Sequence, residues 1–155
     1  MRAVLVIACI SVFGIISATE AKTVQEKLAE VFAISAGQAE FCVNQTEVTH
    51  EDIKALEDKL NPTYNEQLLE EDNTLRAIST LVCAAQAQGT MQGAKLQMPK
   101  IHELVNGVSE MSISAKNRMH KLLDNCYTGV KDLTNENEVG LRFITCMIVR
   151  HPLHD

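Results

Sequence analysis

Apolar residues recur every three or four positions along most of the chain, which is the period of a helix with one buried face. A capping box that starts at Thr23 opens the first of these stripes and predicts a helix that runs toward Phe41. Thr49 caps a second stripe, and Asn61-Pro62 marks its end. These patterns predict two helices before residue 62.

Three further stripes follow, and each is opened by a residue type that favours a helix start. They predict helices from Asn73 to Gly89, from Pro99 to Val108, and from Ser112 or Ser114 to Gly129. Residues 89–93, which begin and end with glycine, are predicted to form a loop.

The last segment, Glu136 to Val149, is apolar almost all round, as expected for a helix that runs through a core. A buried strand is the competing interpretation of residues 141–149, because β-branched side chains are frequent there. Nothing nearby offers such a strand a partner, since no hairpin dipeptide lies between alternating runs. We therefore predict an all-α fold of about six helices around one core.

The first residues resemble a targeting segment rather than part of the fold. Arg2 is followed by an unbroken apolar run from Ala3 to Ile16 and then by small residues. A membrane-spanning helix needs about 20 apolar residues, so this shorter run is interpreted as a secretory signal peptide, with cleavage after Ala18 or after Ala21. We expect a signal peptide over residues 1–18 and a single secreted, extracellular domain over residues 19–155.

The charge balance limits the possible partners. Loss of the signal peptide removes Arg2 from the 14 basic residues and none of the 20 acidic residues, so the net charge changes from −6 to −7. Nucleic acid and anionic membranes are poor partners for such an acidic chain. Trp is absent and aromatic residues make up 4%, so an internal cavity is expected to be lined by aliphatic side chains and some of the six Met.

Cysteine usage agrees with secretion. Cys9 lies in the signal peptide, and four cysteines remain, at positions 42, 83, 126 and 146. An even number in an oxidising compartment predicts two disulfides, and the spacing alone does not select among the three possible pairings. These cysteines are too widely spaced for a zinc knuckle.

Two short motifs bear on other chemistry. The segment His102 to Asn106 begins like the helix of a zinc protease, but Asn106 stands where the second histidine ligand is needed, so no metal site is expected. Asn44-Gln45-Thr46 is a glycosylation sequon, which we expect on a connecting loop. No set of serine, histidine and acid indicates a catalytic triad, and no cofactor is indicated.

The four cysteines are separated by 40, 42 and 19 residues. This spacing resembles that of the insect odorant-binding proteins (pheromone and general odorant-binding proteins), whose six cysteines include C-x3-C in the third helix and C-x8-C in the last. Ser79 and Asn137 stand where the two missing cysteines would lie, so the chain resembles the Minus-C subgroup. The segments from Cys42 to Ile53 and from Leu75 to Gly89 also agree with the family.

The resemblance implies the disulfides Cys42–Cys83 and Cys126–Cys146, with Ser79 and Asn137 as polar neighbours in place of a third bridge. It also implies an apolar cavity that carries a small hydrophobic molecule without catalysis. The implied protein is a monomer or weak homodimer that meets a chemosensory receptor only indirectly and inserts into no membrane. From the helix faces we expect the cavity to be lined by Leu81, Val105, Met119, Leu122, Phe143 and Met147.

Two other functions stay open at this point. A general lipid or hormone carrier in haemolymph or a gland secretion would use the same fold, whereas a helical signalling ligand would act through its surface and have a solid core. The tail with His151 and His154 adds a hypothesis, in which protonation near about pH 6 loosens the tail and releases the ligand. The alternative is an exposed tail with no such coupling.

Overall fold

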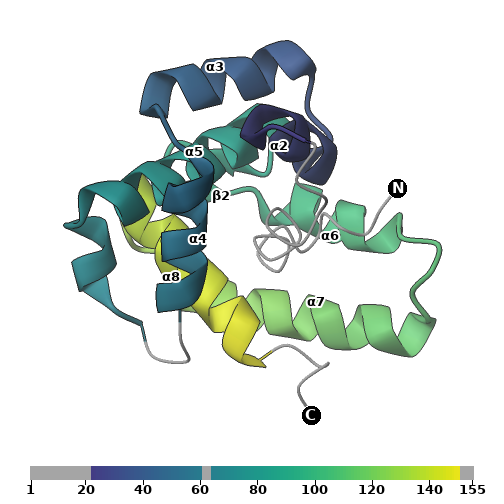
Figure 1. Cartoon of the computed structure of the whole chain (residues 1–155). Coiled ribbons are helices and arrows are strands. Elements are labelled where there is room, and N and C mark those ends of the chain that lie inside the picture. The colour runs from purple at the N-terminus through teal and green to yellow at the C-terminus, as the bar shows by residue number, and fades with distance from the viewer. Residues whose placement is uncertain (1–21, 61–63, 151–155) are drawn as a thin grey trace.

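The structure is a computed structural model that describes residues 22–60 and 64–150. Most of these residues are helical, and the helices pack around one hydrophobic core (Figure 1). The predicted signal peptide and the tail with His151 and His154 lie outside the described residues. In the described part of the chain, none of the helices has the length and apolar content that a membrane span requires.

Seven α-helices, one 3-10 helix and one two-stranded sheet are present among the described residues. In chain order they are α2 (Val24–Phe32), α3 (Ala36–Thr46), α4 (His50–Lys59), η2 (Glu66–Leu69), α5 (Asp72–Gln88), β1 (Met91–Gln92), β2 (Lys95–Leu96), α6 (Met98–Asn106), α7 (Ile113–Thr128) and α8 (Glu136–Arg150). The central helix is α5, because it packs against α2, α3, α4 and α8. The mainly helical fold is therefore confirmed, with seven helices in place of about six.

The prediction of a single first helix toward Phe41 is wrong, because two helices form there. Ala33 adopts the left-handed conformation, with φ of 51°, and ends α2. Ser35 then starts α3 through a capping box. Its hydroxyl accepts from the Gln38 N–H, and the Gln38 side chain accepts from the Ser35 N–H. Cys42 consequently lies inside α3 rather than after the first helix.

The start of α5 also differs from the prediction. Asn73 is not the N-cap, because the helix begins at Asp72. The Asn73 side chain instead accepts from the neighbouring Thr74 N–H at 2.8 Å, within the first turn. The Thr74 hydroxyl donates to the Leu68 carbonyl at 2.6 Å, which ties η2 to the beginning of α5.

Other helix signals agree with the sequence. Thr49 caps α4 in a capping box with Asp52, and Ser112 rather than Ser114 caps α7. Pro99 lies in the first turn of α6. Residues 136–150 form α8, so the strand interpretation of residues 141–149 is wrong.

Residues 89–93 do not form a simple loop, which corrects the sequence prediction. Met91 pairs with Leu96, and Gln92 pairs with Lys95, in a short antiparallel hairpin. Gly93 has φ of 58° in the turn, a conformation that glycine adopts at little cost. Each strand has only two residues, too few for the sequence to show the alternation that marks a hairpin.

Two disulfides link the helices in pairs, and they confirm the pairing that the resemblance implied. Cys42–Cys83 joins α3 to α5, and Cys126–Cys146 joins α7 to α8. Closing loops of these lengths stabilises a fold by roughly 4 and 3 kcal/mol. Because α5 also packs on α8, the two bridges hold one connected frame of four helices.

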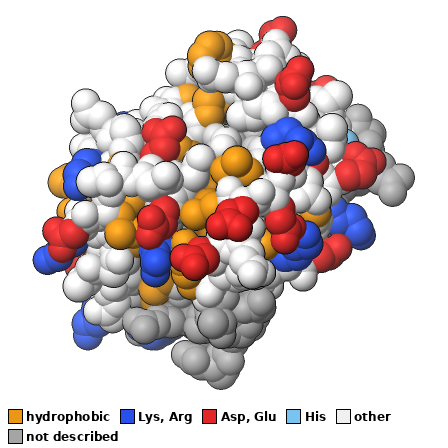
Figure 2. Space-filling view, turned by 90° about the vertical axis from the view of Figure 1, so that its left-hand side faces the viewer, with side chains coloured by type: hydrophobic (Ala, Val, Ile, Leu, Met, Phe, Trp, Pro, Cys, Tyr) orange, Lys and Arg blue, Asp and Glu red, His pale blue; other side chains and the backbone are white. Residues whose placement is uncertain are grey.

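The surface is mixed and mainly acidic on the face that Figure 2 presents, where Asp and Glu side chains lie among hydrophobic and basic ones. Two large hydrophobic residues of the described chain are exposed, Phe41 at 63% and Ile113 at 79%. Phe41 is on α3 and Ile113 begins α7, so they belong to different elements.

Candidate functional site

An apolar pocket of about 70 Å³ lies where α5, α6 and α8 face the hairpin and the end of α2. Each helix turns one apolar stripe inward, and the pocket is the space that these stripes leave between them. Its wall consists of Phe32, Leu81, Val82, Ala85, Gln88, Thr90, Met91, Leu96, Ile101, Leu104, Gly140, Phe143 and Ile144.

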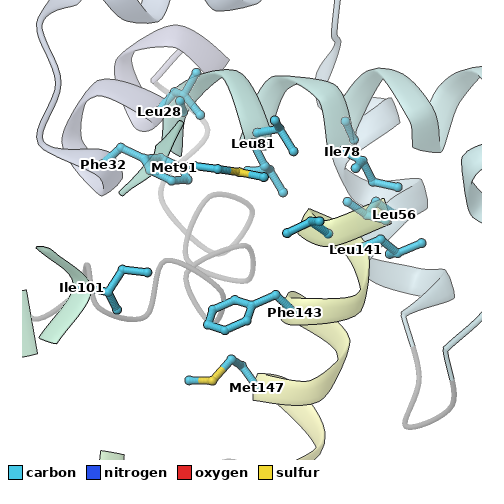
Figure 3. Packing of buried hydrophobic residues seen from close by; sticks show 14 of the residues in the cluster. Leu28, Phe32, Leu56, Ile78, Leu81, Met91, Ile101, Leu141, Phe143 and Met147 are labelled. Atoms are coloured by element: carbon cyan, nitrogen blue, oxygen red, sulfur yellow. The ribbon is translucent and has the colours of Figure 1, made fainter. Parts of the chain in front are cut away.

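Two of the six residues expected to line a cavity lie in the wall of this pocket. Leu81 comes from α5 and Phe143 from α8. Figure 3 shows Phe143 and Met147 on the same side of α8, with both side chains directed toward Ile101. The other four expected residues are buried in the core but are not part of the wall: Val105, Met119, Leu122 and Met147.

Sequence reasoning missed most of the wall. Met91 and Leu96 reach it because they pair across the hairpin, whose first strand lies in the predicted loop over residues 89–93. Phe32 and Ile101 belong to apolar stripes that were recognised, but a stripe only indicates burial. Whether a buried side chain meets another side chain or a hollow depends on how the helices cross.

The two polar side chains of the wall are already hydrogen-bonded within the fold. The Gln88 amide donates to the Phe32 carbonyl at 2.9 Å, and its oxygen accepts from the Thr90 hydroxyl at 2.8 Å. The first bond fastens the end of α5 to the end of α2, and the second ties α5 to the residue before the hairpin. The rest of the wall is apolar, so the pocket presents mainly hydrocarbon to a guest molecule.

A chain of polar side chains links α6 to α7. His102 of α6 faces His120 of α7, with their ring centroids 4.7 Å apart. Nε2 of His102 lies 2.7 Å from Oδ1 of Asp124, and Nε2 of His120 lies 2.8 Å from Oδ1 of Asn106. Burial lowers the pKa of His120, and the neighbouring His102 lowers it further. A neutral His120 ring with its proton on Nε2 donates to Asn106, and its Nδ1 faces Nδ1 of His102.

A second hollow is a surface groove of about 480 Å³ beside the Cys42–Cys83 disulfide. Its lining combines polar and apolar residues of α3 and α5: Ser35, Gly37, Gln38, Phe41, Cys42, Cys83, Gln86 and Ala87. This groove opens more widely to the outside than the inner pocket does. The inner pocket is therefore the better candidate for enclosing an apolar molecule.

The sequon lies in a helix, which corrects the expectation of a connecting loop. Asn44, Gln45 and Thr46 form the last turn of α3, because the helix continues to Thr46 before Glu47 ends it. Asn44 is exposed. Thr46 is half-buried, and its hydroxyl oxygen lies 2.6 Å from that of Thr80 on α5.

Comparison with known proteins agrees with the fold and the cysteine framework. The PBP/GOBP family matches residues 20–149. No curated protein and no solved structure matches the chain. Members of this family are secreted, soluble, non-enzymatic binding proteins. With a mainly helical fold, two disulfides in the implied pairing and a match over residues 20–149, the chain belongs to the PBP/GOBP family.

Proposed function

We propose that this protein is a secreted carrier that binds a small hydrophobic molecule, of the odorant or pheromone type, in an internal cavity and transports it unchanged. The observation that carries this proposal is the inner pocket, whose wall is apolar except for two hydrogen-bonded side chains. A guest gains about 25 cal/mol for each Å² of apolar surface that it buries. Membership in a family of non-enzymatic binding proteins supports the same function.

The pocket has to enlarge to hold such a guest. Ligand sites typically occupy roughly 300–1000 Å³, compared with about 70 Å³ here. Among the described elements, α6 makes its main contacts with α7, and neither disulfide includes a residue of α6. We infer that α6 moves outward when a ligand enters. The widened cavity would then include buried residues of α6, α7 and α8: Val105, Met119, Leu122 and Met147.

The wall supports selection by size rather than by functional group. Gln88 and Thr90 are already bonded to each other and to the Phe32 carbonyl, so a polar ligand group would find few free partners to replace its bonds to water. Met91 is a flexible side chain that adapts to different shapes. Ligands are therefore expected to be long and mostly hydrocarbon, which fits a semiochemical and also a general lipid or hormone.

We also propose that the protein is a Minus-C member of the family and acts as a monomer or weak homodimer. All four cysteines of the described chain take part in the two disulfides. Ser79 and Asn137, the positions of the missing bridge, lie on α5 and α8, which pack against each other. Any contact with a chemosensory receptor would be indirect, through delivery of the ligand.

Displacement of an apolar naphthylamine fluorophore tests the carrier function. Ala85 lines the inner pocket and Ala87 lines the surface groove, although both are half-buried alanines of α5. Ala85→Leu adds an isopropyl group that fills the pocket, so its affinity for the fluorophore is expected to fall at least about tenfold, the equivalent of about 1.4 kcal/mol. Ala87→Leu is the matched control and should bind as the wild type does.

The outcomes separate the competing functions. Micromolar uptake that long-chain alcohols or volatile esters displace, and that only Ala85→Leu weakens, supports the carrier. Loss of binding in Ala87→Leu alone would place the ligand in the surface groove. Absence of uptake, together with tight binding to a cell-surface protein, would support a signalling ligand instead.

A further inference from the structure

Two exposed residues lie one helical turn apart on the outer side of α3. Phe41 is 63% exposed, and Asn44, the first residue of the sequon, follows three positions later and is also exposed. Side chains three positions apart on a helix are neighbours on its surface. Ala39 and Cys42 are buried where α3 packs on its neighbours, so Phe41 and Asn44 face away from the core.

We propose that Asn44 carries an N-linked glycan whose first sugar lies over the exposed ring of Phe41. An aromatic face attracts the positively polarised C–H groups of a pyranose ring, as it attracts the edge of another aromatic ring. A sugar attached to Asn44 starts within reach of Phe41 because the two side chains are neighbours. The modification would therefore cover one of the two large hydrophobic residues that the described chain leaves exposed.

The modification requires a defined co-substrate, a polyprenyl-diphosphate oligosaccharide of the secretory compartment. The amide nitrogen of Asn44 forms a bond to C1 of the first N-acetylglucosamine. The bond between that carbon and the diphosphate oxygen breaks, the diphosphate leaves with its electron pair, and the amide nitrogen loses one proton. No oxidant or reductant takes part.

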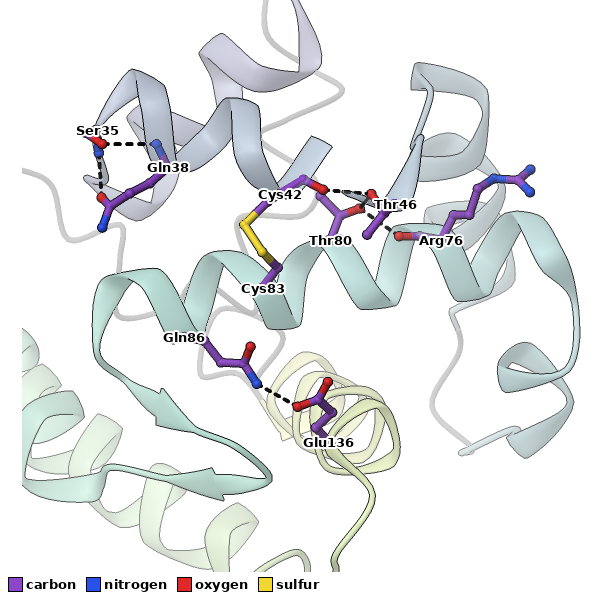
Figure 4. Close-up of a disulfide and its surroundings, with 9 residues drawn as sticks. All are labelled: Ser35, Gln38, Cys42, Thr46, Arg76, Thr80, Cys83, Gln86 and Glu136. Carbon is purple, nitrogen blue, oxygen red and sulfur yellow. Dashed lines mark hydrogen bonds between the residues drawn. A yellow bond between two sulfur atoms is a disulfide. The ribbon is translucent and has the colours of Figure 1, made fainter. Parts of the chain in front are cut away.

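The structure also indicates when this step takes place. In a helix, residues two positions apart do not face each other, and here Asn44 is exposed while Thr46 is directed toward Thr80 (Figure 4). The Thr46 hydroxyl oxygen lies 3.0 Å from the Cys42 carbonyl and 2.6 Å from the Thr80 hydroxyl. An enzyme that reads the amide and the hydroxyl together cannot reach both in this fold. Transfer to Asn44 therefore precedes the packing of α3 on α5 and the closure of Cys42–Cys83.

Occupancy is tested by secreting the full chain from insect cells and treating it with peptide-N-glycosidase. A mobility shift is expected for the wild type and for Thr46→Ser, which keeps the sequon. Asn44→Gln should show no shift. Secreted wild-type protein that shows no shift, from cells that modify a reference glycoprotein, would overturn the proposal.

The order of events is tested with unmodified protein in microsomal extract. The reduced and unfolded chain is expected to accept the oligosaccharide, whereas the folded chain with both disulfides is not. Equal acceptance by the two forms would show that the helix does not hide the sequon.

The contact with Phe41 is tested by comparing thermal midpoints. The glycosylated protein is expected to melt about 3 °C above Asn44→Gln, the shift that a small stabilisation gives in a domain of this size. In the Phe41→Ala background, which should fold because Phe41 is exposed, that difference is expected to disappear. The same difference in both backgrounds would show that the sugar does not rest on Phe41.

Discussion

A β-carbon placed on Gly140 would lie 2.8 Å from Cγ2 of Val82. Gly140 is in α8 and Val82 is in α5, so the absence of a side chain at residue 140 lets the two helices approach closely. Both residues also belong to the wall of the inner pocket. The crossing of α5 and α8 thus sets one side of the candidate ligand site.

Gly140→Ala is expected to destabilise the protein by about 1–3 kcal/mol, because the Val82 side chain cannot move aside without disturbing the core. Urea denaturation measures this change. Gly37→Ala is the control, since its new β-carbon would meet only the Ser35 hydroxyl oxygen at 4.0 Å. Alanine favours helix over glycine, so the control should be as stable as the wild type or more stable. Equal behaviour of the two variants would contradict the close approach at Gly140.

A third disulfide is expected to form in the double variant Ser79→Cys and Asn137→Cys. Ser79 lies one turn before Cys83 on α5, and Asn137 lies in the first turn of α8, which packs on α5. Within the described chain, Oδ1 of Asn137 is buried without a hydrogen-bond partner, so replacing this side chain removes an unsatisfied polar atom. We expect roughly 2–4 kcal/mol of added stability. Counting free thiols after oxidation tests whether the bond forms, and each single variant serves as a control. Two free thiols in the double variant would show that residues 79 and 137 do not come within bonding distance.

Acidification is expected to weaken the contact between α6 and α7. The pKa of His120 is lower in the folded protein than its usual value of 6.5, chiefly because of burial. The stability it contributes is therefore present above the unfolded-state pKa and is lost as the pH falls through the folded-state value. Among its neighbours, His102 and Lys116 disfavour the charged ring and Asp124 favours it.

Thermal melts between about pH 7 and pH 5 test this linkage. His120→Gln is expected to lose less stability on acidification, because glutamine keeps a donor and an acceptor but does not titrate. His50→Gln, at an exposed residue of α4, should keep the pH dependence of the wild type. If the melting temperature of His120→Gln falls with pH as steeply as that of the wild type, His120 is not the titrating group.

Asp52→Asn is expected to lower the free energy of unfolding by about 1–3 kcal/mol at neutral pH. Arg76 of α5 donates to both carboxylate oxygens of Asp52 on α4, at 2.9 and 3.0 Å, and these bonds lower the pKa of Asp52. The stability that the ionised Asp52 contributes is present above its unfolded-state pKa of about 3.8. It is lost as the pH falls through the lower folded-state pKa. The difference between wild type and variant should therefore shrink in strong acid.

The more exposed pair of Arg142 and Glu138, 3.0 Å apart in α8, provides the comparison. Glu138→Gln should cost no more than about 0.5 kcal/mol, as is usual for pairs one helical turn apart. If Glu138→Gln lowers the free energy of unfolding as much as Asp52→Asn does, the buried carboxylate of Asp52 does not stabilise the fold more than an ordinary helix pair.

Local signals in the sequence predicted the helices well where caps and stripes agreed. Thr49 and Ser112 cap the helices expected of them, and the cysteine spacing led to the correct pairing through its family resemblance. The break between α2 and α3 was missed because apolar residues continue across it. Ser35 followed three residues later by Gln38 is a capping-box pattern that could have revealed it.

The candidate site was less predictable than the fold. Leu81 and Met119 are buried alike, but only Leu81 borders the pocket. Periodicity identifies the inward side of a helix and carries no information about crossing angles, which decide where side chains leave space. Met91 could not be placed from its pattern at all, since the two-residue strands of the hairpin are too short to show alternation.

The two disulfides hold some of the helices that line the pocket but not α6. Cys42–Cys83 and Cys126–Cys146 anchor α5 and α8, whereas α6 is held by packing and by the polar chain through His102. A bound guest is therefore expected to slow amide hydrogen exchange more in α6 than in α5, because a disulfide and four packed helices already hold α5 in place. We therefore expect a ligand to enter on the side of α6, which neither bridge holds.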